Sequence, residues 1–356
     1  MKIGIYSPYL DTLTGGEKYI LTAAKCLSSK HEVFLFWDGN EEKHRAEIQR
    51  KFNLSLDKVE FTRNIFSKNT SFLSRFWQSR LFDRILVLSD GSIPLVWPPL
   101  CLHFQSPMEW IDTNSLKTRL KLQRVKRVIC NSLYTKKYID KKFHVNSIVI
   151  YPPVERKKMM DKKKDNIILN IGRFGIRAAG SSYKKQEVLI DVFKRMVNAG
   201  LKKWKLILIV SIFESDEKRL KEIQNTIKDY PIEIIQSPNS NVLWQYMQKA
   251  KIYWHASGFG EDLEKHPDRA EHFGISTAEA MGMGAVPVVI NAGGQKEIVK
   301  DDENGFLWNS EEELQEKTNE VISDEALFFR LQKQAQKDVE KFNTQRFCEE
   351  IYKTLV

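Results

Sequence analysis

The sequence predicts an α/β protein made of two doubly wound, Rossmann-like domains, each a parallel sheet covered by helices. The length of 356 residues suits two domains of about 150 to 200 residues each. Short β-rich runs alternate with segments of helical period in both halves, which is the pattern of a parallel sheet with helical crossovers. A Lys-rich stretch without apolar period, residues 155–165, separates the two series and predicts an interdomain linker.

The first domain, residues 1–154, contains six predicted strands. A helix over residues 17–29 places Ile20, Leu21, Ala24 and Leu27 on one face, and another is expected over residues 132–143 with Ser132 as its N-cap. The predicted strands are residues 2–7, 32–37, 85–89, 100–104, 127–131 and 147–151.

The second domain, residues 165–340, begins with a strand at Asn166 and repeats the alternation. The chain from residue 311 onward is predicted to be helical, with a break near residues 341–343. The segment 341–356 is expected to pack back toward the first domain. Within the second domain, strands are predicted near residues 166–172, 205–210, 232–236, 252–255 and 286–290, and helices over residues 187–198, 215–228, 241–250 and 274–283.

The net charge of +10 lies entirely in the first half. Residues 1–153 hold 24 Lys and Arg against 14 Asp and Glu, or +10, and residues 154–356 hold 32 against 32. This asymmetry indicates an anionic partner such as a lipid surface, an acidic acceptor or a nucleic acid, although a merely soluble basic surface is an alternative. Residues 69–84 and 114–127 mix cations with apolar residues. This composition is typical of a helix on a membrane surface, and equally of a helix that packs its apolar stripe on the sheet and exposes its charges to solvent.

Several classes of protein are excluded by what the sequence lacks. No apolar run approaches the about 20 residues of a membrane span, and the first residues predict a buried strand and no signal peptide. The four cysteines are widely spaced, without CxxC, which predicts neither a disulfide framework nor a zinc site and favours a reducing, cytoplasmic setting. Because GxxxxGK[ST], GxGxxG, HExxH, GxSxG and DxD are all absent, cations and backbone N–H groups are expected to hold any phosphate, without a metal.

Glu271 and Glu279 flank Gly274 in the stretch EHFGISTAE, where a helix is predicted to begin at Ile275 or Ser276. Free N–H groups at a helix N-terminus attract a phosphate, and Glu271 lies in the loop that precedes them. Glu279 lies about one turn into the helix and can accept hydrogen bonds from hydroxyls. Two carboxylates beside an anion site suit a ligand with both phosphate and vicinal hydroxyls, such as a sugar nucleotide.

These residues resemble glycosyltransferase family 4, a group of retaining, nucleotide-sugar-dependent transferases with the GT-B fold and an interdomain active-site cleft. EHFGISTAE matches its E-x7-E motif, and AMGMGAVPVVINAGGQKEIV follows as in the family. Four further stretches match in order: LTGGEKY with Gly15 and Gly16, CLHFQSP with His103, NSLYT at residues 131–135, and GRF followed by KKQEVLIDVF. The resemblance spans nearly the whole chain.

The resemblance implies a role for each matched residue. Glu271 binds the donor sugar, Glu279 binds the nucleotide ribose, and His103 contacts the sugar near its reacting face. Arg173 and Lys184 neutralise the leaving diphosphate, with Lys184 preferred to Lys185 by counting back from Val188. Backbone groups of the glycine turn and of the helix start complete the donor site at Gly15, Gly16, Phe273, Gly274, Ile275 and Ser276.

Three stretches depart from the family pattern. The loop at residues 174–183, with its small residues 178–182, and the insert at residues 258–270 are both longer than usual. VSIFESDEKRL replaces a glycine-rich turn after a strand of the second domain. The insert is expected to influence the choice of donor sugar or acceptor.

The predicted reaction is therefore transfer of a hexose, with mannose favoured, from a UDP- or GDP-sugar to a hydroxyl of a lipid-linked or polysaccharide glycan, with retention and without a metal or other cofactor. The basic first half predicts peripheral contact with an anionic membrane at its cytoplasmic face. A catalytically silent sugar-nucleotide-binding protein and a GT-B phosphorylase or epimerase are alternatives. A nucleic-acid partner is not expected, because no nucleic-acid motif accompanies the charge.

Overall fold

The computed structural model describes residues 1–108, 111, 113, 115–155, 164–174, 184–212 and 214–356. Its contacts divide the chain into two compact units. Unit 1 comprises Met1–Pro153 and Thr344–Val356, and unit 2 comprises Val154–Asn343. Residues 156–163 of the predicted linker and residues 175–183 of the long loop, with its small residues 178–182, lie outside the described residues.

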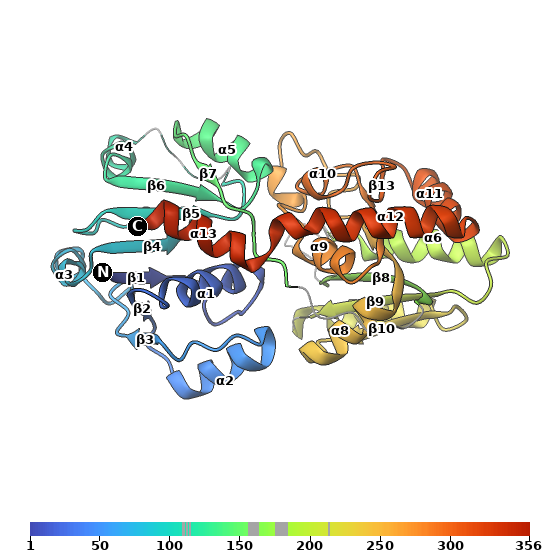
Figure 1. The fold of residues 1–356 in the computed structure, drawn as a ribbon, viewed down its shortest axis with the longest axis horizontal. Coiled ribbons are helices and arrows are strands. Elements are labelled where there is room, and N and C mark those ends of the chain that lie inside the picture. Colours follow the sequence, from blue (N-terminus) through green and yellow to red (C-terminus); the bar gives the residue numbers. More distant parts are fainter. Residues whose placement is uncertain (109–110, 112, 114, 156–163, 175–183, 213) are drawn as a thin grey trace. The chain divides into compact units, whose positions relative to one another are not determined.

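Unit 1 is a seven-stranded parallel sheet in the order β3-β2-β1-β4-β5-β6-β7 (Figure 1). The order reverses beside β1, which makes the sheet doubly wound. The strands are β1 (Lys2–Tyr6), β2 (Glu32–Phe36), β3 (Val59–Thr62), β4 (Arg84–Leu88), β5 (Leu100–Phe104), β6 (Val125–Cys130) and β7 (Ile148–Val149). The helices are α1 (Gly15–Leu27), α2 (Glu41–Phe52), α3 (Phe72–Gln78), the short 3-10 helix η1 (Ser79–Leu81), α4 (Leu116–Leu122), α5 (Leu133–Phe143) and α13 (Thr344–Leu355).

Unit 2 is a six-stranded parallel sheet in the order β10-β9-β8-β11-β12-β13. Its strands are β8 (Asp165–Arg173), β9 (Lys205–Ser211), β10 (Ile232–Gln236), β11 (Ala250–His255), β12 (Val286–Ile290) and β13 (Phe306–Trp308). Its α-helices are α6 (Gln186–Asn198), α7 (Glu217–Thr226), α8 (Ser240–Lys249), α9 (Ile275–Gly282), α10 (Gln295–Ile298), α11 (Glu311–Ser323) and α12 (Glu325–Asp338). Short 3-10 helices are η2 (Glu214–Asp216), η3 (Pro267–Arg269) and η4 (Val339–Phe342).

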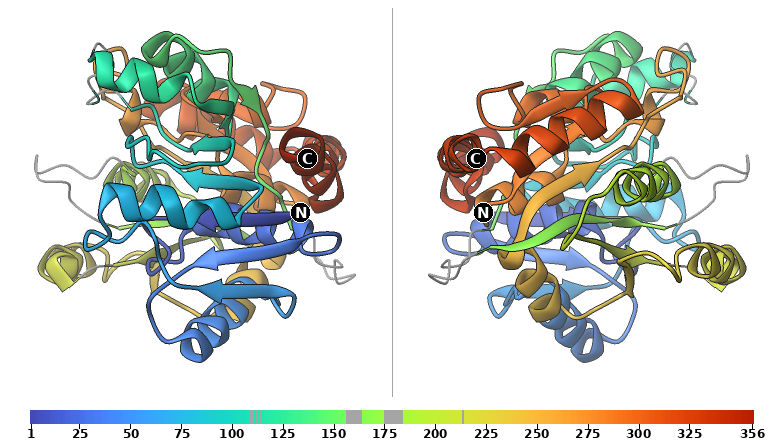
Figure 2. Two further views of the ribbon diagram at one scale, coloured as in Figure 1. Left: turned by 90° about the vertical axis from the view of Figure 1, so that its left-hand side faces the viewer. Right: turned by 90° about the vertical axis from the view of Figure 1, so that its right-hand side faces the viewer.

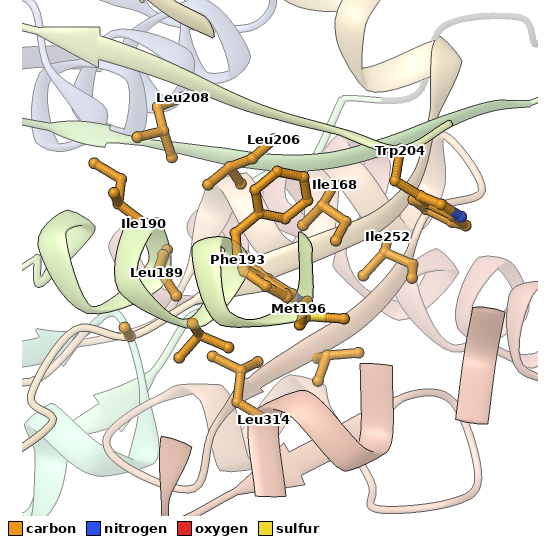
Figure 3. Close-up of a cluster of buried hydrophobic side chains, with 14 of the residues drawn as sticks. Ile168, Leu189, Ile190, Phe193, Met196, Trp204, Leu206, Leu208, Ile252 and Leu314 are labelled. Carbon is orange, nitrogen blue, oxygen red and sulfur yellow. The ribbon is translucent and has the colours of Figure 1, made fainter. Parts of the chain in front are cut away.

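Helix α6 shows how an amphipathic segment covers the sheet of unit 2. Its buried residues Leu189, Phe193 and Met196 recur at helical spacing and pack on Ile168 of β8 and Leu206 of β9 (Figure 3). Burial of side chains of this size contributes roughly 1.5 to 3 kcal/mol each. This packing holds β8 and β9, whose ends approach the candidate site.

The predicted fold class, two doubly wound parallel-sheet domains, is confirmed. Among the described residues, the strands β3 and β13, the helices α2 and α10 and the 3-10 helix η3 were not predicted. Helix α2 buries only His44 and Ile48 among its twelve residues, so its sequence lacks an apolar stripe. Strand β3 has a half-exposed pattern at the edge of the sheet, and such short edge strands carry little apolar signal.

The C-terminal helix α13 belongs to unit 1, where it packs against α1 (Figures 1 and 2). Phe347, Ile351 and Leu355, four residues apart, are buried on this face. The expectation that the cysteines form no disulfide is wrong, because a disulfide joins Cys26 of α1 to Cys348 of α13. Wide spacing in the sequence misled the prediction, since the packing of two helices brings residues 322 positions apart to a Cα–Cα distance of 5.3 Å.

Within the described part of the chain, no helix is both long enough and apolar enough to cross a bilayer.

Candidate functional site

Unit 2 gathers most of the predicted site residues where its strands end. Arg173 is the last residue of β8, His255 is the last residue of β11, and Glu271 precedes α9 by four residues. Gln186 at the start of α6 donates a hydrogen bond to the Arg173 carbonyl at 3.2 Å. Ligands of open α/β sheets bind outside the carboxyl ends of the strands, so this is the expected edge for a site.

Glu271 is the centre of a charged cluster. Its Oε2 atom lies 2.6 Å from Lys184 Nζ and 3.1 Å from His255 Nε2. The three side chains come from the segment before α6, the end of β11 and the loop before α9. They are mostly buried, with exposed fractions of 17% for Lys184, 3% for His255 and 20% for Glu271.

The protonation of this cluster follows from its contacts. Burial raises the pKa of Glu271, but the Lys184 ammonium and the His255 hydrogen bond outweigh it and hold that pKa well below its usual range. Burial lowers the pKa of His255, so its imidazole is neutral. Because the Ser257 N–H donates to His255 Nδ1 at 3.3 Å, the ring proton resides on Nε2 and is donated to Glu271.

The loop that carries Glu271 is held by the glycine pair of the GGQ turn. The Gly294 N–H donates to the Glu271 carbonyl at 2.7 Å. A Cβ at Gly293 would lie 2.3 Å from the Glu271 carbonyl oxygen, and a Cβ at Gly294 would lie 2.3 Å from that of His272. Only glycine permits this approach, so the turn determines where the Glu271 backbone lies.

The N-terminus of α9 follows directly. Gly274 is its N-cap residue in the left-handed region, at φ 111°, and a Cβ there would lie 2.9 Å from the Gln295 side chain. Ile275 is the first helical residue, as predicted, and Phe273 before it is buried. The free N–H groups of this first turn lie beside the Glu271 cluster, where they favour an anion.

Glu279 is buried in the second turn of α9. Tyr253 of β11 connects this helix to the strand ends, because its hydroxyl lies 2.8 Å from Ser276 Oγ and 3.3 Å from the Ile171 carbonyl. Burial raises the pKa of Tyr253, and the charges of Glu271 and Glu279 raise it further.

The structure separates the two candidate lysines. Lys184 contacts Glu271, whereas Lys185 Nζ lies 2.6 Å from Glu261 Oε1 in the insert at 258–270. The other oxygen of Glu261 lies 2.6 Å from Arg269 Nη1, and the Glu261 side chain is only 6% exposed. Lys185 is thus engaged by the insert, and Lys184 is the lysine beside the helix N-terminus.

Unit 1 brings His103 and the glycine turn together through Gln105. The Gln105 amide nitrogen lies 3.0 Å from His103 Nε2 and 3.2 Å from the Gly16 carbonyl. A Cβ at Gly16 would lie 2.5 Å from Gln105 Oε1, so a larger residue there would displace the Gln105 side chain. Glu17 holds the turn from the other side by accepting from the Thr14 N–H at 2.8 Å.

His103 is completely buried at the end of β5 and stacks on Tyr19, with ring centroids 3.9 Å apart. Burial lowers its pKa to about 3, against a smaller opposite effect of the Ile129 carbonyl. The side chain is therefore a neutral imidazole. Gly15 begins α1 immediately after the turn.

His255, Glu261, Arg269 and Gln105 were not predicted as site residues. His255 ends a predicted strand (IYWH), and His103 is the penultimate residue of another (LCLHF), so a histidine near the end of a strand was the signal that could have identified it. Nothing in the sequence pairs Glu261 with Lys185, because that contact depends on the path of the insert. Among the described residues, no three His, Cys, Asp or Glu side chains converge as ligands for a metal ion.

Comparison with known proteins agrees with this arrangement. A family model described as "Glycosyl transferases group 1" matches residues 153–338. The chain is 26% identical over 247 residues to a Dictyostelium discoideum protein named GDP-Man:Man(3)GlcNAc(2)-PP-Dol alpha-1,2-mannosyltransferase, a match that covers 64% of this chain and 46% of that protein. It is 27% identical over 251 residues to an uncharacterized glycosyltransferase of Methanocaldococcus jannaschii, covering 68% of this chain and 62% of that one.

Among solved structures, the chain resembles Anabaena HepE in complex with UDP and glucose, with a TM-score of 0.73 and 18% identity over 99% of both chains. At this identity the likeness concerns the fold. The chain spans about half the length of the Dictyostelium relative.

Proposed function

Because the chain belongs to the glycosyl transferases group 1 family, whose model matches residues 153–338, we propose that it is a retaining glycosyltransferase of family 4 with the E-x7-E motif. It moves a hexose from a UDP- or GDP-sugar to a hydroxyl of a glycan acceptor and needs no metal. The observation that carries this proposal is the Lys184–Glu271–His255 cluster beside the N-terminus of α9.

This cluster suits a sugar diphosphate because it offers positive and hydrogen-bonding groups in one place. The donor diphosphate takes the Lys184 ammonium and the N–H groups at Gly274 and Ile275, which leaves the Glu271 carboxylate to accept hydrogen bonds from sugar hydroxyls. His255, neutral and donating from Nε2, keeps Glu271 oriented while Lys184 changes partner. Glu271 stays ionised throughout, since its pKa lies well below the usual range.

Arg173 and Lys184 together neutralise the charge that develops on the departing diphosphate, which lowers the barrier to breaking the glycosidic bond. Glu279 accepts hydrogen bonds from the nucleotide ribose. For His103 we propose the role that the family resemblance implies, contact with the donor sugar. The incoming hydroxyl attacks from the side of the leaving group, and a diphosphate oxygen accepts its proton.

We further propose GDP-mannose as the donor and a lipid-linked glycan as the acceptor. The name of the Dictyostelium relative supports both, at 26% identity. The excess of cations in residues 1–153 supports peripheral contact with an anionic membrane.

The test is a transfer assay with radiolabelled GDP-mannose, UDP-glucose and UDP-N-acetylglucosamine and a lipid-linked oligosaccharide extract, with and without EDTA. We expect labelled lipid product from GDP-mannose, unchanged by EDTA, with an α-linked sugar by NMR. A product with inverted configuration would contradict the retaining mechanism. Binding of a sugar nucleotide without any turnover would favour the silent binding protein.

A further inference from the structure

One region of unit 1 exposes large apolar side chains that neighbouring elements leave uncovered. They come from α3, η1, the chain before β5, and α4. Among the described residues, exposed apolar side chains also occur elsewhere, such as Phe329 in unit 2, and single exposed residues are ordinary. We name this region the α3–α4 face and define it by Leu73, Trp77, Leu81, Trp97, Leu116 and Leu120, which are between 48% and 73% exposed.

A ring contact and a hydrogen bond connect the tryptophans of this face with the end of α4. The rings of Trp77 and Trp97 stack at 6.2 Å, and the Arg80 guanidinium lies over both rings at 4.8 and 4.7 Å. Leu116 and Leu120 are one turn apart on α4, and Arg124 follows two residues after the end of this helix. Arg124 donates to the Trp97 carbonyl at 3.3 Å, which joins α4 to the tryptophan pair.

The charge around the face is strongly positive. Residues 69–84 and 114–127, which contain most of the face, hold nine Lys and Arg and one acidic residue, Asp83. Tryptophan rings flanked by Arg, with leucines beside them, match the boundary between lipid headgroups and acyl chains. A protein partner of mixed charge would not require this excess of cations.

The face lies away from the candidate residues of unit 1. Helices α3 and α4 precede β4 and β6 and lie at the edge of the sheet where these strands begin (Figure 1), the edge that the left view of Figure 2 faces. His103 and Gly16 lie where β5 and β1 end, at the opposite edge. A surface bound to the α3–α4 face therefore leaves the His103 end of the sheet accessible.

We propose that the α3–α4 face docks unit 1 onto a bilayer that contains anionic lipids. The leucines and tryptophans enter the headgroup boundary while the flanking cations contact lipid phosphates. The inference rests on the proposed function in one respect, since a lipid-linked acceptor places the substrate at the same membrane.

The experiment is flotation of the full chain with vesicles of phosphatidylcholine alone or with 40 mole percent phosphatidylglycerol. We expect binding only to the anionic vesicles, and Trp77→Ser/Leu120→Ser to weaken it at least about tenfold. The matched control is Phe329→Ser, which should bind like the wild type. Phe329 lies outside the face and is 55% exposed, close to the 56% of Trp77.

The charges are tested separately. Arg119→Ser/Lys126→Ser should weaken binding by about tenfold, because each cation near an anionic surface contributes about 1 kcal/mol. The control Lys218→Ser/Lys221→Ser removes two exposed lysines of α7 and should have no effect.

Three results would overturn the proposal: no preference for anionic vesicles, equal loss with Phe329→Ser, or sedimentation that reveals a dimer abolished by Trp77→Ser/Leu120→Ser. The last would assign the face to a second copy of the chain. Titration with GDP and UDP in buffer without vesicles tests the proposed function separately from the membrane proposal. Trp77→Ser/Leu120→Ser should bind nucleotide like the wild type. A wild-type protein that binds vesicles but no nucleotide would contradict the proposed transferase function and leave the membrane proposal intact.

Discussion

Lys184 Nζ and Glu271 Oε2 lie 2.6 Å apart across 87 positions of sequence, beside the N-terminus of α9. The Lys184 ammonium therefore adds a positive charge beside the N-terminus of α9, where the helix dipole already favours an anion. A diphosphate that binds there competes with Glu271 for the same ammonium. In the proposed mechanism, binding of the donor diphosphate to Lys184 therefore also frees the Glu271 carboxylate from that lysine.

Gly294→Ala tests how the Glu271 loop is held. Its Cβ would lie 2.3 Å from the His272 carbonyl oxygen and 2.5 Å from Phe273 Cα, both backbone atoms that cannot move freely. We expect unit 2 to lose about 2 to 3 kcal/mol of stability and to bind nucleotide at least tenfold more weakly. Denaturant unfolding and calorimetry measure the two effects.

Gly260→Ala is the control for this substitution. It places a Cβ at positive φ, 71°, where no atom lies within 4 Å, so it carries backbone strain without a clash. It should cost only about 1 to 2 kcal/mol and leave nucleotide affinity unchanged. Equal effects of the two variants would contradict the role assigned to the glycine turn.

Glu261→Gln tests the anchor of the insert. The buried Glu261 carboxylate pairs with both Lys185 and Arg269, and its removal leaves two cations side by side. We expect a loss of about 2 kcal/mol in the stability of unit 2. Asp262→Asn, which breaks an exposed pair with Lys265 in the same insert, should leave the unfolding midpoint unchanged, and a larger effect of Asp262→Asn would refute the assignment.

The buried imidazole of His103 predicts a loss of stability in acid. Its pKa is about 3 in the folded chain and about 6.5 in the unfolded one, so the unfolded state binds more protons between these values. Lowering the pH from 7 to 5 should therefore cost unit 1 about 2 kcal/mol through this group. The burial of His255 acts in the same direction on unit 2.

Thermal unfolding of wild type and His103→Gln at pH 7 and pH 5 measures this effect. His103→Gln cannot titrate, so its loss between the two pH values should be smaller by about 2 kcal/mol, whatever its stability at pH 7. His266→Gln, at an exposed position, is the control and should keep the wild-type dependence. Identical pH dependence in all three proteins would argue against a buried neutral His103.

The disulfide between Cys26 and Cys348 predicts sensitivity to reductants. It closes a loop of 322 residues, and such bridges contribute typically about 2 to 4 kcal/mol. Dithiothreitol should lower the unfolding temperature of unit 1 in the wild type and not in Cys26→Ser/Cys348→Ser. Burial raises the pKa of Cys101 to about 11 and of Cys130 to about 12, so neither supplies a competing thiolate near neutral pH. Four free thiols by titration of the oxidised, denatured protein would disprove the bridge.

Much of the fold could be predicted because its strands are long apolar runs. β5, β10 and β12 begin and end at the predicted residues, and each is bounded by a change in pattern. Helices and strands whose own sequence carries little apolar pattern, and which form through contacts with neighbouring elements, could not be predicted. Helix α2 has too few buried residues to produce a stripe, and β13 is three residues long.

The candidate site shows the same division. Glu271, Arg173 and Lys184 belong to local motifs, and Lys184 and Glu271 prove to be in contact. The contacts of His255 and Glu261 join them to partners 16 and 76 residues away, so the sequence contains no local signal for these pairings, although the position of His255 at a strand end was itself visible. The disulfide was missed for the same reason.

The most direct test of the proposed function is calorimetric titration of GDP and UDP into wild type, Lys184→Met, Glu279→Ala and the control Lys218→Ser. We predict selective micromolar binding of one nucleotide by wild type and control, weakened at least about tenfold in the other two, since a charge-assisted hydrogen bond contributes roughly 1.5 to 3 kcal/mol. Absence of nucleotide binding in the wild type, or wild-type affinity in Lys184→Met, would contradict the site proposed at the N-terminus of α9.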